Sequence, residues 1–222
     1  MLAALRHVDC WIFDLDNCLY PASTDLFALI DERMGDYIQR LAGCGSVEAR
    51  RLQKGYFHAH GTTLAGLMAS HGVDPHDFLD FVHDIDLARI TADPDVVAAI
   101  DMLSGRKFVF TNGDEAYARR VLDKLGLANA FDGMHDIHAM EYVPKPDPRA
   151  YAAMCQRHAI DPETALFVED MARNLRPAKA LGMTTVWIDN GSEQAGHGDD
   201  RSFIDYRIAD IGVWLNEITG DQ

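Results

Sequence analysis

The sequence predicts an α/β fold: a parallel sheet with crossover helices, interrupted by an inserted all-helical segment. From residue 93 onward, short apolar runs alternate with helical patterns, which is typical of a parallel sheet because each strand needs a crossover to reach the next. The apolar run at residues 8–13 has the same strand character, whereas residues 21–92 contain only helical patterns. We therefore expect a core domain of residues 1–20 and 93–222 and a helical cap domain of residues 21–92.

The core begins with the strand at residues 8–13 and continues after residue 93. The later strands are expected at residues 107–110, 133–137, 166–168 and 184–188 and near Tyr206. Asp114 and Asp147 stand at expected helix starts, and Gly126 and Gly182 at helix ends. A polar, Gly-rich loop is expected at residues 191–200, before the last strand and a C-terminal helix.

Four helices are expected in the cap. Each should begin at a short polar side chain, whose oxygen can accept a hydrogen bond from a free N–H group of the first turn. The expected N-caps are Ser23 or Thr24, Ser46, Thr62 and Asp74. Pro75 then occupies the first helical position, where its missing N–H costs nothing.

The composition is that of a globular protein with an acidic surface. The 222 residues are 48% hydrophobic and 25% charged, which favours a packed fold over a disordered one. The formal net charge is −15, from 20 basic and 35 acidic residues, so the field of the protein repels nucleic-acid polymers. A small anionic substrate would need local positive charge from a few Lys or Arg side chains or from a metal ion.

The cysteines and the apolar runs indicate where the protein resides. The four cysteines Cys10, Cys18, Cys44 and Cys155 have no C-x-x-C spacing, so we expect reduced thiols and neither a zinc site nor a disulfide framework. No run approaches the roughly 18 apolar residues of a membrane span, and the N-terminal apolar stretch is too short for a signal peptide. We therefore expect a cytoplasmic protein without a membrane partner.

Polar clusters lie at the expected ends of the strands. Asp14 and Asp16 follow the first strand, and in an extended chain both carboxylates point the same way and repel unless a cation or a proton intervenes. The later clusters supply a hydroxyl with backbone N–H groups, a lysine between prolines, and an acid pair ahead of an asparagine. These later clusters are Thr111-Asn112-Gly113, Lys145 and Glu169-Asp170 with Asn174. Because parallel strands end at one edge of the sheet, the set predicts metal-assisted phosphoryl transfer.

In this order the clusters resemble the four motifs of the haloacid dehalogenase-like (HAD) hydrolase superfamily, over nearly the whole chain. The resemblance implies a Rossmann-like core with a helical cap inserted after the first motif, a phosphatase activity and Mg²⁺ as cofactor. The stretches 14–21 and 60–67 further resemble the branch called pyrimidine 5′-nucleotidases. That resemblance implies a small phosphorylated metabolite as partner, namely a pyrimidine nucleoside 5′-monophosphate.

The resemblance also implies how two carboxyl groups would divide the chemistry. Asp14 would attack phosphorus and become an aspartyl-phosphate. Asp16 would protonate the leaving oxygen and then deprotonate the hydrolytic water. For this the pKa of Asp16 must lie well above the reference value of about 3.9, and the neighbouring Asp14 and phosphate would raise it.

The remaining motif residues are implied to bind the metal and the phosphate. The expected Mg²⁺ ligands are Asp14, the carbonyl of Asp16, Asp170 and, directly or through water, Glu169. The expected phosphate-binding residues are Thr111, Asn112 and Gly113, with Lys145 balancing charge on Asp14 and the transferred group. Cap residues that could face the leaving group are Tyr20, Tyr56, Phe57, His58, His60 and Thr62, although aromatic residues at helical spacing can equally be core.

Other activities are compatible with parts of this pattern. A phosphatase of sugar phosphates or phosphoglycolate would use the same core, as would a phosphomutase, whereas a dehalogenase would lack the acid that Asp16 provides. Aspartate-phosphorylated signalling domains also combine acids, Thr and Lys around Mg²⁺, but their acid pair precedes the phosphorylated aspartate and they have no such insertion. A catalytically dead scaffold would have lost a motif residue, and none is missing.

Overall fold

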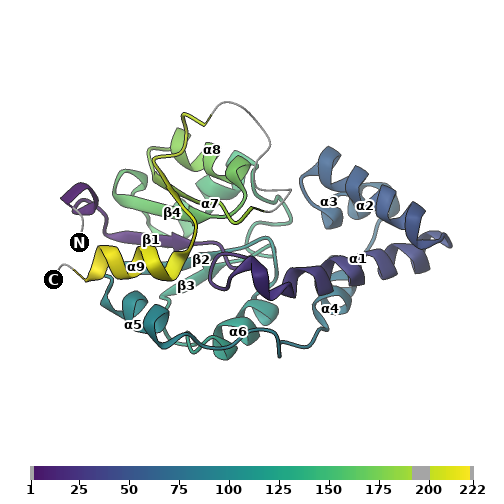
Figure 1. The fold of residues 1–222 in the computed structure, drawn as a ribbon. Helices are drawn as coiled ribbons and strands as arrows, with labels where there is room; N and C mark the ends of the chain where they lie inside the picture. The colour runs from purple at the N-terminus through teal and green to yellow at the C-terminus, as the bar shows by residue number, and fades with distance from the viewer. Residues whose placement is uncertain (1–2, 192–200, 221–222) are drawn as a thin grey trace.

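The computed structural model describes residues 3–191 and 201–220. In these residues six strands form one parallel sheet in the order β3-β2-β1-β4-β5-β6 (Figure 1), which confirms the predicted α/β fold. The strands are β1 (Cys10–Phe13), β2 (Arg106–Phe110), β3 (Gly133–His135), β4 (Ala165–Glu169), β5 (Thr184–Ile188) and β6 (Tyr206–Ile208). Because β1 lies between β2 and β4, the segments that follow these three strands are neighbours at one edge.

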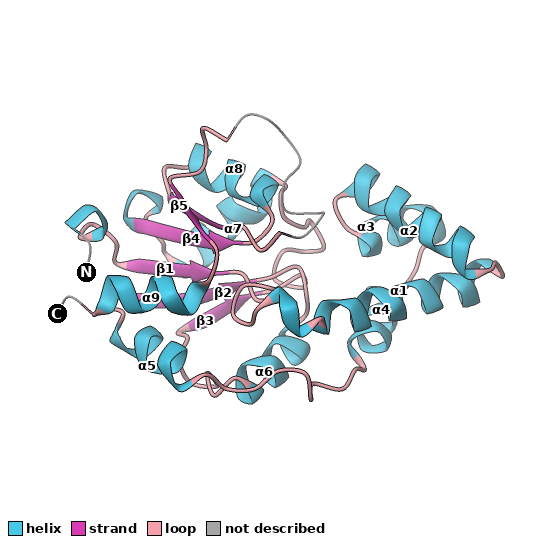
Figure 2. Ribbon diagram, in the orientation of Figure 1, coloured by secondary structure: helices cyan, strands magenta, loops and turns pink. Residues whose placement is uncertain are grey.

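Helices cover both faces of the sheet, with α7 and α8 on one side and α5, α6 and α9 on the other (Figures 1 and 2). They are α5 (Pro94–Met102), α6 (Glu115–Lys124), α7 (Pro148–His158), α8 (Ala172–Ala180) and α9 (Ile211–Thr219). Trp11 of β1 packs against Trp214 of α9 with ring centroids 6.5 Å apart, and Phe110 of β2 against Tyr151 of α7 at 5.1 Å. Burial on both faces explains the nearly continuous apolar runs of the strands.

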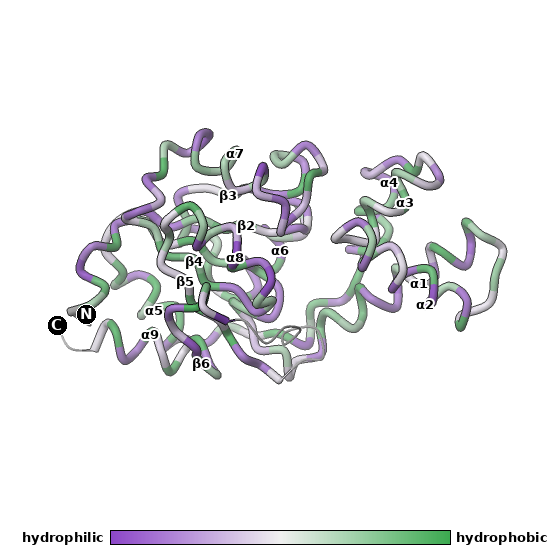
Figure 3. The backbone as a smooth tube through the Cα atoms, turned by 90° about the horizontal axis from the view of Figure 1, so that it is seen from above, coloured by the Kyte–Doolittle hydropathy of each residue, from purple (hydrophilic) through white to green (hydrophobic). Residues whose placement is uncertain are grey.

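The inserted segment consists of four helices beyond the carboxyl ends of the strands (Figure 1). They are α1 (Leu26–Ala42), α2 (Ser46–His60), α3 (Thr63–His71) and α4 (Pro75–His83), and hydrophobic and hydrophilic residues alternate along them (Figure 3). Short 3₁₀ helices lie at Ala3–Leu5, Ala22–Thr24 and Pro162–Thr164. The division of the chain at residues 20 and 93 stays our proposal for the bounds of the cap.

Two of the four predicted cap N-caps are confirmed. Thr62 accepts a hydrogen bond from the N–H of Ala65 at 3.1 Å, and Asp74 from that of His76 at 2.9 Å. The other two predictions are wrong. Ser23 and Thr24 lie in the 3₁₀ helix, so that α1 starts after Asp25, and α2 begins at Ser46 itself, after Gly45.

In the core, Asp114 caps α6 and Asp147 caps α7, as predicted. The third strand is shorter than predicted and ends at His135. Asp136 leaves the sheet because its carboxylate accepts hydrogen bonds from the N–H groups of Glu115 at 2.9 Å and Ala139 at 2.8 Å.

Three further expectations concern the chain as a whole. The four cysteines are free thiols. Among the described residues, none of the helices combines the length and the apolar character needed to cross a membrane. The predicted loop at 191–200 lies outside the described residues apart from Gly191.

Candidate active site

Residues at the carboxyl ends of β1, β2 and β4 converge with Lys145 at one edge of the sheet. Asp14 follows β1 directly, and its N–H donates to the carbonyl oxygen of Val168 in β4 at 2.9 Å. The Lys145 ammonium lies 2.8 Å from Oδ1 of Asp14 and 2.7 Å from Oε2 of Glu169. It also donates to the carbonyl oxygen of Phe110, the last residue of β2, at 2.8 Å. The fold therefore gathers these motif residues in one place.

Lys145 is fixed at both its side chain and its backbone. The residue is 1% exposed, and its three acceptors match the three donors of an ammonium group. The side-chain amide of Asn112 accepts from the N–H of Lys145 at 2.9 Å and donates to its carbonyl oxygen at 3.1 Å. Burial alone would lower the pKa of Lys145, but the carboxylates of Asp14 and Glu169 outweigh it and raise the pKa.

The loop Thr111–Gly113, where we expect phosphate to bind, offers fewer donors than its sequence implies. Both ends of the Asn112 side-chain amide are used by the Lys145 backbone. The N–H of Gly113 donates to Oγ1 of Thr111 at 3.0 Å. The N–H of Asn112 donates to no residue in the described part of the chain. That N–H, the hydroxyl proton of Thr111 and the second N–H of the Asn112 side-chain amide are the donors this loop can offer to an anion.

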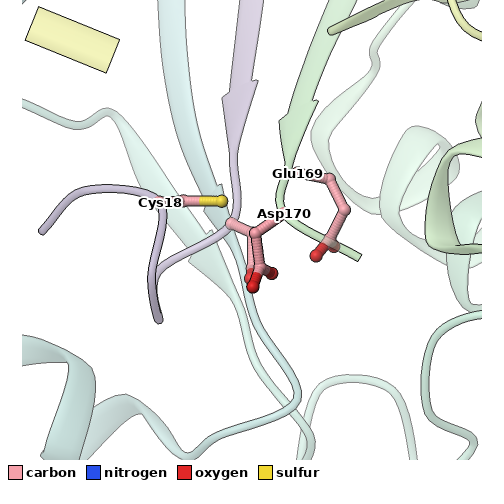
Figure 4. A group of neighbouring side chains, drawn as sticks. Cys18, Glu169 and Asp170 are labelled. Carbon is pink, nitrogen blue, oxygen red and sulfur yellow. The ribbon is translucent and has the colours of Figure 1, made fainter. Parts of the chain in front are cut away.

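A buried acidic cluster lies beside Lys145. Candidate ligand atoms of Asp14, Cys18, Glu169 and Asp170 all lie within 4.8 Å of one another (Figure 4 labels the last three). Three carboxylates against one ammonium bury an excess of negative charge. Burial raises the pKa of both Asp14 and Asp170 well above 3.8, and the Glu169 carboxylate adds to the rise. Buried excess negative charge with oxygen ligands fits a hard divalent cation such as Mg²⁺.

Within this cluster the carboxylate oxygens of Asp170 make the weaker hydrogen bonds and are therefore more available to a metal ion. Oε1 of Glu169 accepts from the N–H of Met171 at 3.1 Å, while Oε2 accepts from Lys145. Glu169, predicted as a metal ligand, thus has both oxygens in short hydrogen bonds. In the described part of the chain, the donors to Asp170 are farther away, Asn17 at 3.5 Å and Asn190 at 3.3 Å, both to Oδ2.

Asn174, one helical turn after Asp170, carries a further buried oxygen. Its Oδ1 is buried and has no hydrogen-bond partner among the described residues. A buried amide oxygen without a partner is the kind of acceptor that a bound ion or its water satisfies. The predicted place of Asn174 beside a metal therefore has physical support.

Asp16 is held by two tyrosines from different parts of the chain. The hydroxyls of Tyr20 and Tyr117 donate to the same oxygen, Oδ1, at 2.5 and 2.8 Å. Desolvation by burial raises the pKa of Asp16, while the two tyrosine hydrogen bonds oppose the rise. The direction is the one we predicted, but its main cause is burial and not the charge of Asp14.

The residues predicted to face a leaving group are spread over several positions. Tyr20 is buried against Asp16, and the Thr62 hydroxyl oxygen is taken by the N–H of Ala65. The hydroxyl oxygen of Tyr56 lies 2.7 Å from Nε2 of His71, within the inserted segment. His58 and His60 are exposed and line a cavity of about 440 Å³ between α2, the loop 142–149 and Arg173.

That cavity adjoins the loop that carries Lys145. Pro144 and Pro146 line it, and a methyl group on Gly61 would lie 3.9 Å from the Lys145 carbonyl oxygen. Arg173 donates to the carbonyl oxygen of Gly61 at 3.0 Å, and its guanidinium lies 4.2 Å from the centroid of the Phe57 ring. The turn between α2 and α3 is therefore held against the core at this point.

The fold and the site together describe an α/β protein whose candidate catalytic residues gather at the carboxyl ends of its strands, beside an inserted set of helices. The family model of haloacid dehalogenase-like hydrolases matches residues 8–182, and the chain belongs to this family. This agrees with the predicted superfamily and excludes the signalling-domain interpretation.

The relatives include phosphatases. The chain is 28% identical over 191 residues to phosphate metabolism protein 8 of Saccharomyces cerevisiae, covering 78% of this chain and 59% of the yeast protein. It is 29% identical over 160 residues to a phosphoglycolate phosphatase of Rhodospirillum rubrum, covering 68% of this chain and 60% of that protein. The crystal structure of a HAD phosphatase from Thermococcus onnurineus has a TM-score of 0.64 at 20% identity, over 96% of this chain and 98% of that one. This last likeness concerns the fold alone.

Proposed function

We propose that the chain is a Mg²⁺-dependent phosphomonoesterase that forms an aspartyl-phosphate on Asp14 and acts on pyrimidine nucleoside 5′-monophosphates. The observation that carries this proposal is the contact of the Lys145 ammonium with Oδ1 of Asp14 at 2.8 Å. Among the described residues nothing donates to Oδ2 of Asp14, so this oxygen can attack phosphorus.

Two displacements at phosphorus make up the proposed reaction. In the first, an oxygen of Asp14 bonds to phosphorus, the ester P–O bond breaks, and Asp16 gives its proton to the leaving oxygen. In the second, Asp16 takes a proton from water, the water oxygen bonds to phosphorus, and the bond to Asp14 breaks. The carboxylate and free phosphate are the products. The raised pKa of Asp16 supports its part as an acid.

The other groups at the strand ends have supporting parts. Asp14, Asp170 and the Asp16 carbonyl would hold Mg²⁺, which when bound offsets the repulsion between carboxylate and phosphate. The Thr111 hydroxyl and the Asn112 N–H would bind phosphoryl oxygens. Lys145 orients the Asp14 carboxyl group and opposes the rise in its pKa.

The cavity beside Lys145 supports a leaving group of nucleoside size. Its volume of about 440 Å³ falls in the range of small-molecule sites. His58 and His60 line it from α2, where an imidazole can stack on a base or donate to its edge. Together with the resemblance of residues 14–21 and 60–67 to pyrimidine nucleotidases, this favours a nucleoside 5′-monophosphate.

The same cavity favours one alternative substrate class. Arg149 and Arg173 both line it, and a guanidinium pairs well with a carboxylate or a second phosphate. Phosphoglycolate and acidic sugar phosphates carry such a group, and one relative of the chain is a phosphoglycolate phosphatase.

Two measurements test the proposal. Asp14→Asn preserves the side-chain shape and should lower kcat with Mg²⁺ by about 10⁴-fold or more, with an unchanged circular dichroism spectrum. If the Asp14→Asn protein kept its phosphatase activity, the assignment of Asp14 as the nucleophile would be wrong. For the substrate, kcat/KM is compared across pyrimidine and purine nucleotides, sugar phosphates and phosphoglycolate. A ranking led by phosphoglycolate or sugar phosphates would replace the nucleotide assignment.

A further inference from the structure

The carboxyl group of Asp16 is contacted on one oxygen only. Oδ1 accepts hydrogen bonds from the hydroxyls of Tyr20 at 2.5 Å and Tyr117 at 2.8 Å. Within the described residues, nothing donates to Oδ2. Both tyrosines are 1% exposed, and they come from positions 97 residues apart, so the convergence of their hydroxyls is a property of the folded chain.

Two donors on one carboxyl oxygen fix more than the position of the side chain. They use the lone pairs of Oδ1 and hold the plane of the carboxyl group. Proton exchange with a substrate oxygen is then confined to Oδ2. A side chain free to rotate would present either oxygen and would spend part of its time turned away from the reacting atoms.

The ring of Tyr117 is itself held by a residue of the inserted segment. His83, the last residue of α4, stacks on this ring with centroids 4.3 Å apart and planes 11° from parallel. Nδ1 of His83 lies 2.5 Å from Oδ2 of Asp114, and Oδ1 of Asp114 accepts from the N–H of Tyr117 at 2.7 Å. Arg120 donates to the carbonyl oxygen of His83.

These contacts hold Tyr117 from both sides of the interface between core and insertion. Asp114 fixes its backbone at the start of α6, and His83 fixes the plane of its ring. A methyl group on Gly113 would lie 3.4 Å from Cδ1 of Tyr117 and 3.7 Å from His83, so the surroundings of the ring are filled. A shift of α4 away from the core would release His83 from this stack.

We propose that Tyr20 and Tyr117 are positioning residues that engage Oδ1 of Asp16 and reserve Oδ2 for proton exchange with the leaving oxygen. His83, paired with Asp114, makes this arrangement depend on the seating of α4. The inference rests on the proposed function, because it takes Asp16 as the general acid.

The test uses the dependence of rate on the leaving group. Cleavage of p-nitrophenyl phosphate expels a stable phenolate and needs little protonation, whereas a nucleoside or alkyl phosphate needs a proton on its leaving oxygen. We expect Tyr117→Phe and Tyr20→Phe to lower kcat/KM for the alkyl ester by about 10- to 100-fold, within the range of general acid catalysis. For p-nitrophenyl phosphate we expect a change of less than about 3-fold, since kcat/KM reports only the steps up to loss of the alcohol. An equal loss on both esters, or no loss on either, would overturn the proposal.

The variants at His83 extend the same test to the inserted segment. His83→Ala removes the stacked ring and should reproduce the leaving-group dependence of Tyr117→Phe in weaker form. His83→Phe keeps a ring against Tyr117 and should restore most of the rate. If both variants behave alike, the connection through α4 is wrong.

Tyr37→Phe is the matched control, because it removes a hydroxyl in α1 that does not contact Asp16. Thermal unfolding shows that each variant is folded.

Asp16→Asn separates the two ways of failing. If this variant shows a strong leaving-group dependence while Tyr117→Phe does not, Asp16 is the acid and only the positioning proposal fails. If Asp16→Asn shows none, the acid assignment of the proposed function fails, and the positioning proposal fails with it.

Discussion

The two sides of the candidate site are held with very different firmness. At the strand ends Lys145 is 1% exposed and has three acceptors, and Asp14 is 7% exposed. Across the interface, His58 and His60 are exposed at the end of α2. The first region is fixed before any ligand arrives, whereas the second leaves its side chains free to adapt. We infer that the strand ends carry the chemistry and that the cap face selects the substrate.

The largest expected effect is on stability and tests how tightly the first region is held. Lys145→Met keeps the length of the side chain but leaves Asp14 and Glu169 buried without their cation. We expect the free energy of unfolding to fall by about 3–5 kcal/mol, the usual result of breaking a buried ion pair by removing one partner. Urea denaturation measures it.

Lys179→Met is the matched control for this loss. Lys179 pairs with Asp205 at 2.6 Å, and the side chains are 37% and 31% exposed. Solvent screening limits such a pair to about 0–1 kcal/mol. Equal losses in the two variants would mean that the strand ends are no more tightly coupled than the surface.

The second prediction concerns the metal. Mg²⁺ at 100 times its dissociation constant should stabilise the protein by about 2.7 kcal/mol. Asp170→Asn removes one buried negative charge, so it should stabilise the metal-free protein and abolish the response to Mg²⁺. Thermal unfolding with EDTA and with Mg²⁺ measures both. Glu48→Gln, at an exposed pair with Arg51 on α2, is the control and should keep the full response.

The same contrast explains what could be predicted from the sequence. Asp14, Thr111 and Asp170 follow strands directly, and in a parallel sheet chain position fixes which edge such residues reach. Their gathering could therefore be predicted. The contact between His83 and Asp114 joins the last residue of α4 to the N-cap of α6, 31 positions apart, and no periodicity links them.

For residues inside the motifs, the sequence also did not predict which partner each side chain contacts. Asn112 belongs to a recognised motif, yet its amide holds the backbone of Lys145, 33 residues away. Tyr20 follows the first motif and contacts Asp16 instead of the cap face. Which of several acceptors a polar group meets depends on packing at the level of ångströms, and residue spacing does not determine it.

The third prediction is a dependence of stability on pH in the metal-free protein. The pKa values of Asp14 and Asp170 are raised above 3.8 in the folded state, so between 3.8 and the raised values the folded chain binds more protons than the unfolded one. These two groups should therefore make stability rise as pH falls through this window, by up to about 1.4 kcal/mol per pH unit for each proton.

Urea denaturation in EDTA between pH 8 and pH 5 measures this slope. Asp170→Asn should lower its contribution, because one of the carboxyl groups with a raised pKa, Asp14, Asp16 and Asp170, is gone. Glu169, whose pKa Lys145 lowers against the effect of burial, opposes this slope. His135 and His158 oppose it as well, because burial lowers their pKa values, that of His135 to about 4. An Asp170→Asn protein with the same slope as the parent protein would contradict the part assigned to Asp170.

The smallest effect is expected on the adaptable side. Arg173 holds the turn at Gly61 and lines the cavity, so Arg173→Gln should weaken substrate binding without touching the reacting atoms. Loss of one charge-assisted hydrogen bond at a half-buried site corresponds to an increase in KM of about 10-fold with little change in kcat. Steady-state kinetics on the best substrate measures the split, and Arg119→Gln, at an exposed pair with Glu115, is the control. If kcat fell and KM did not change, Arg173 would act on the chemical step and not on substrate binding. Residues of α8 would then belong to the catalytic region and not to the region that selects the substrate.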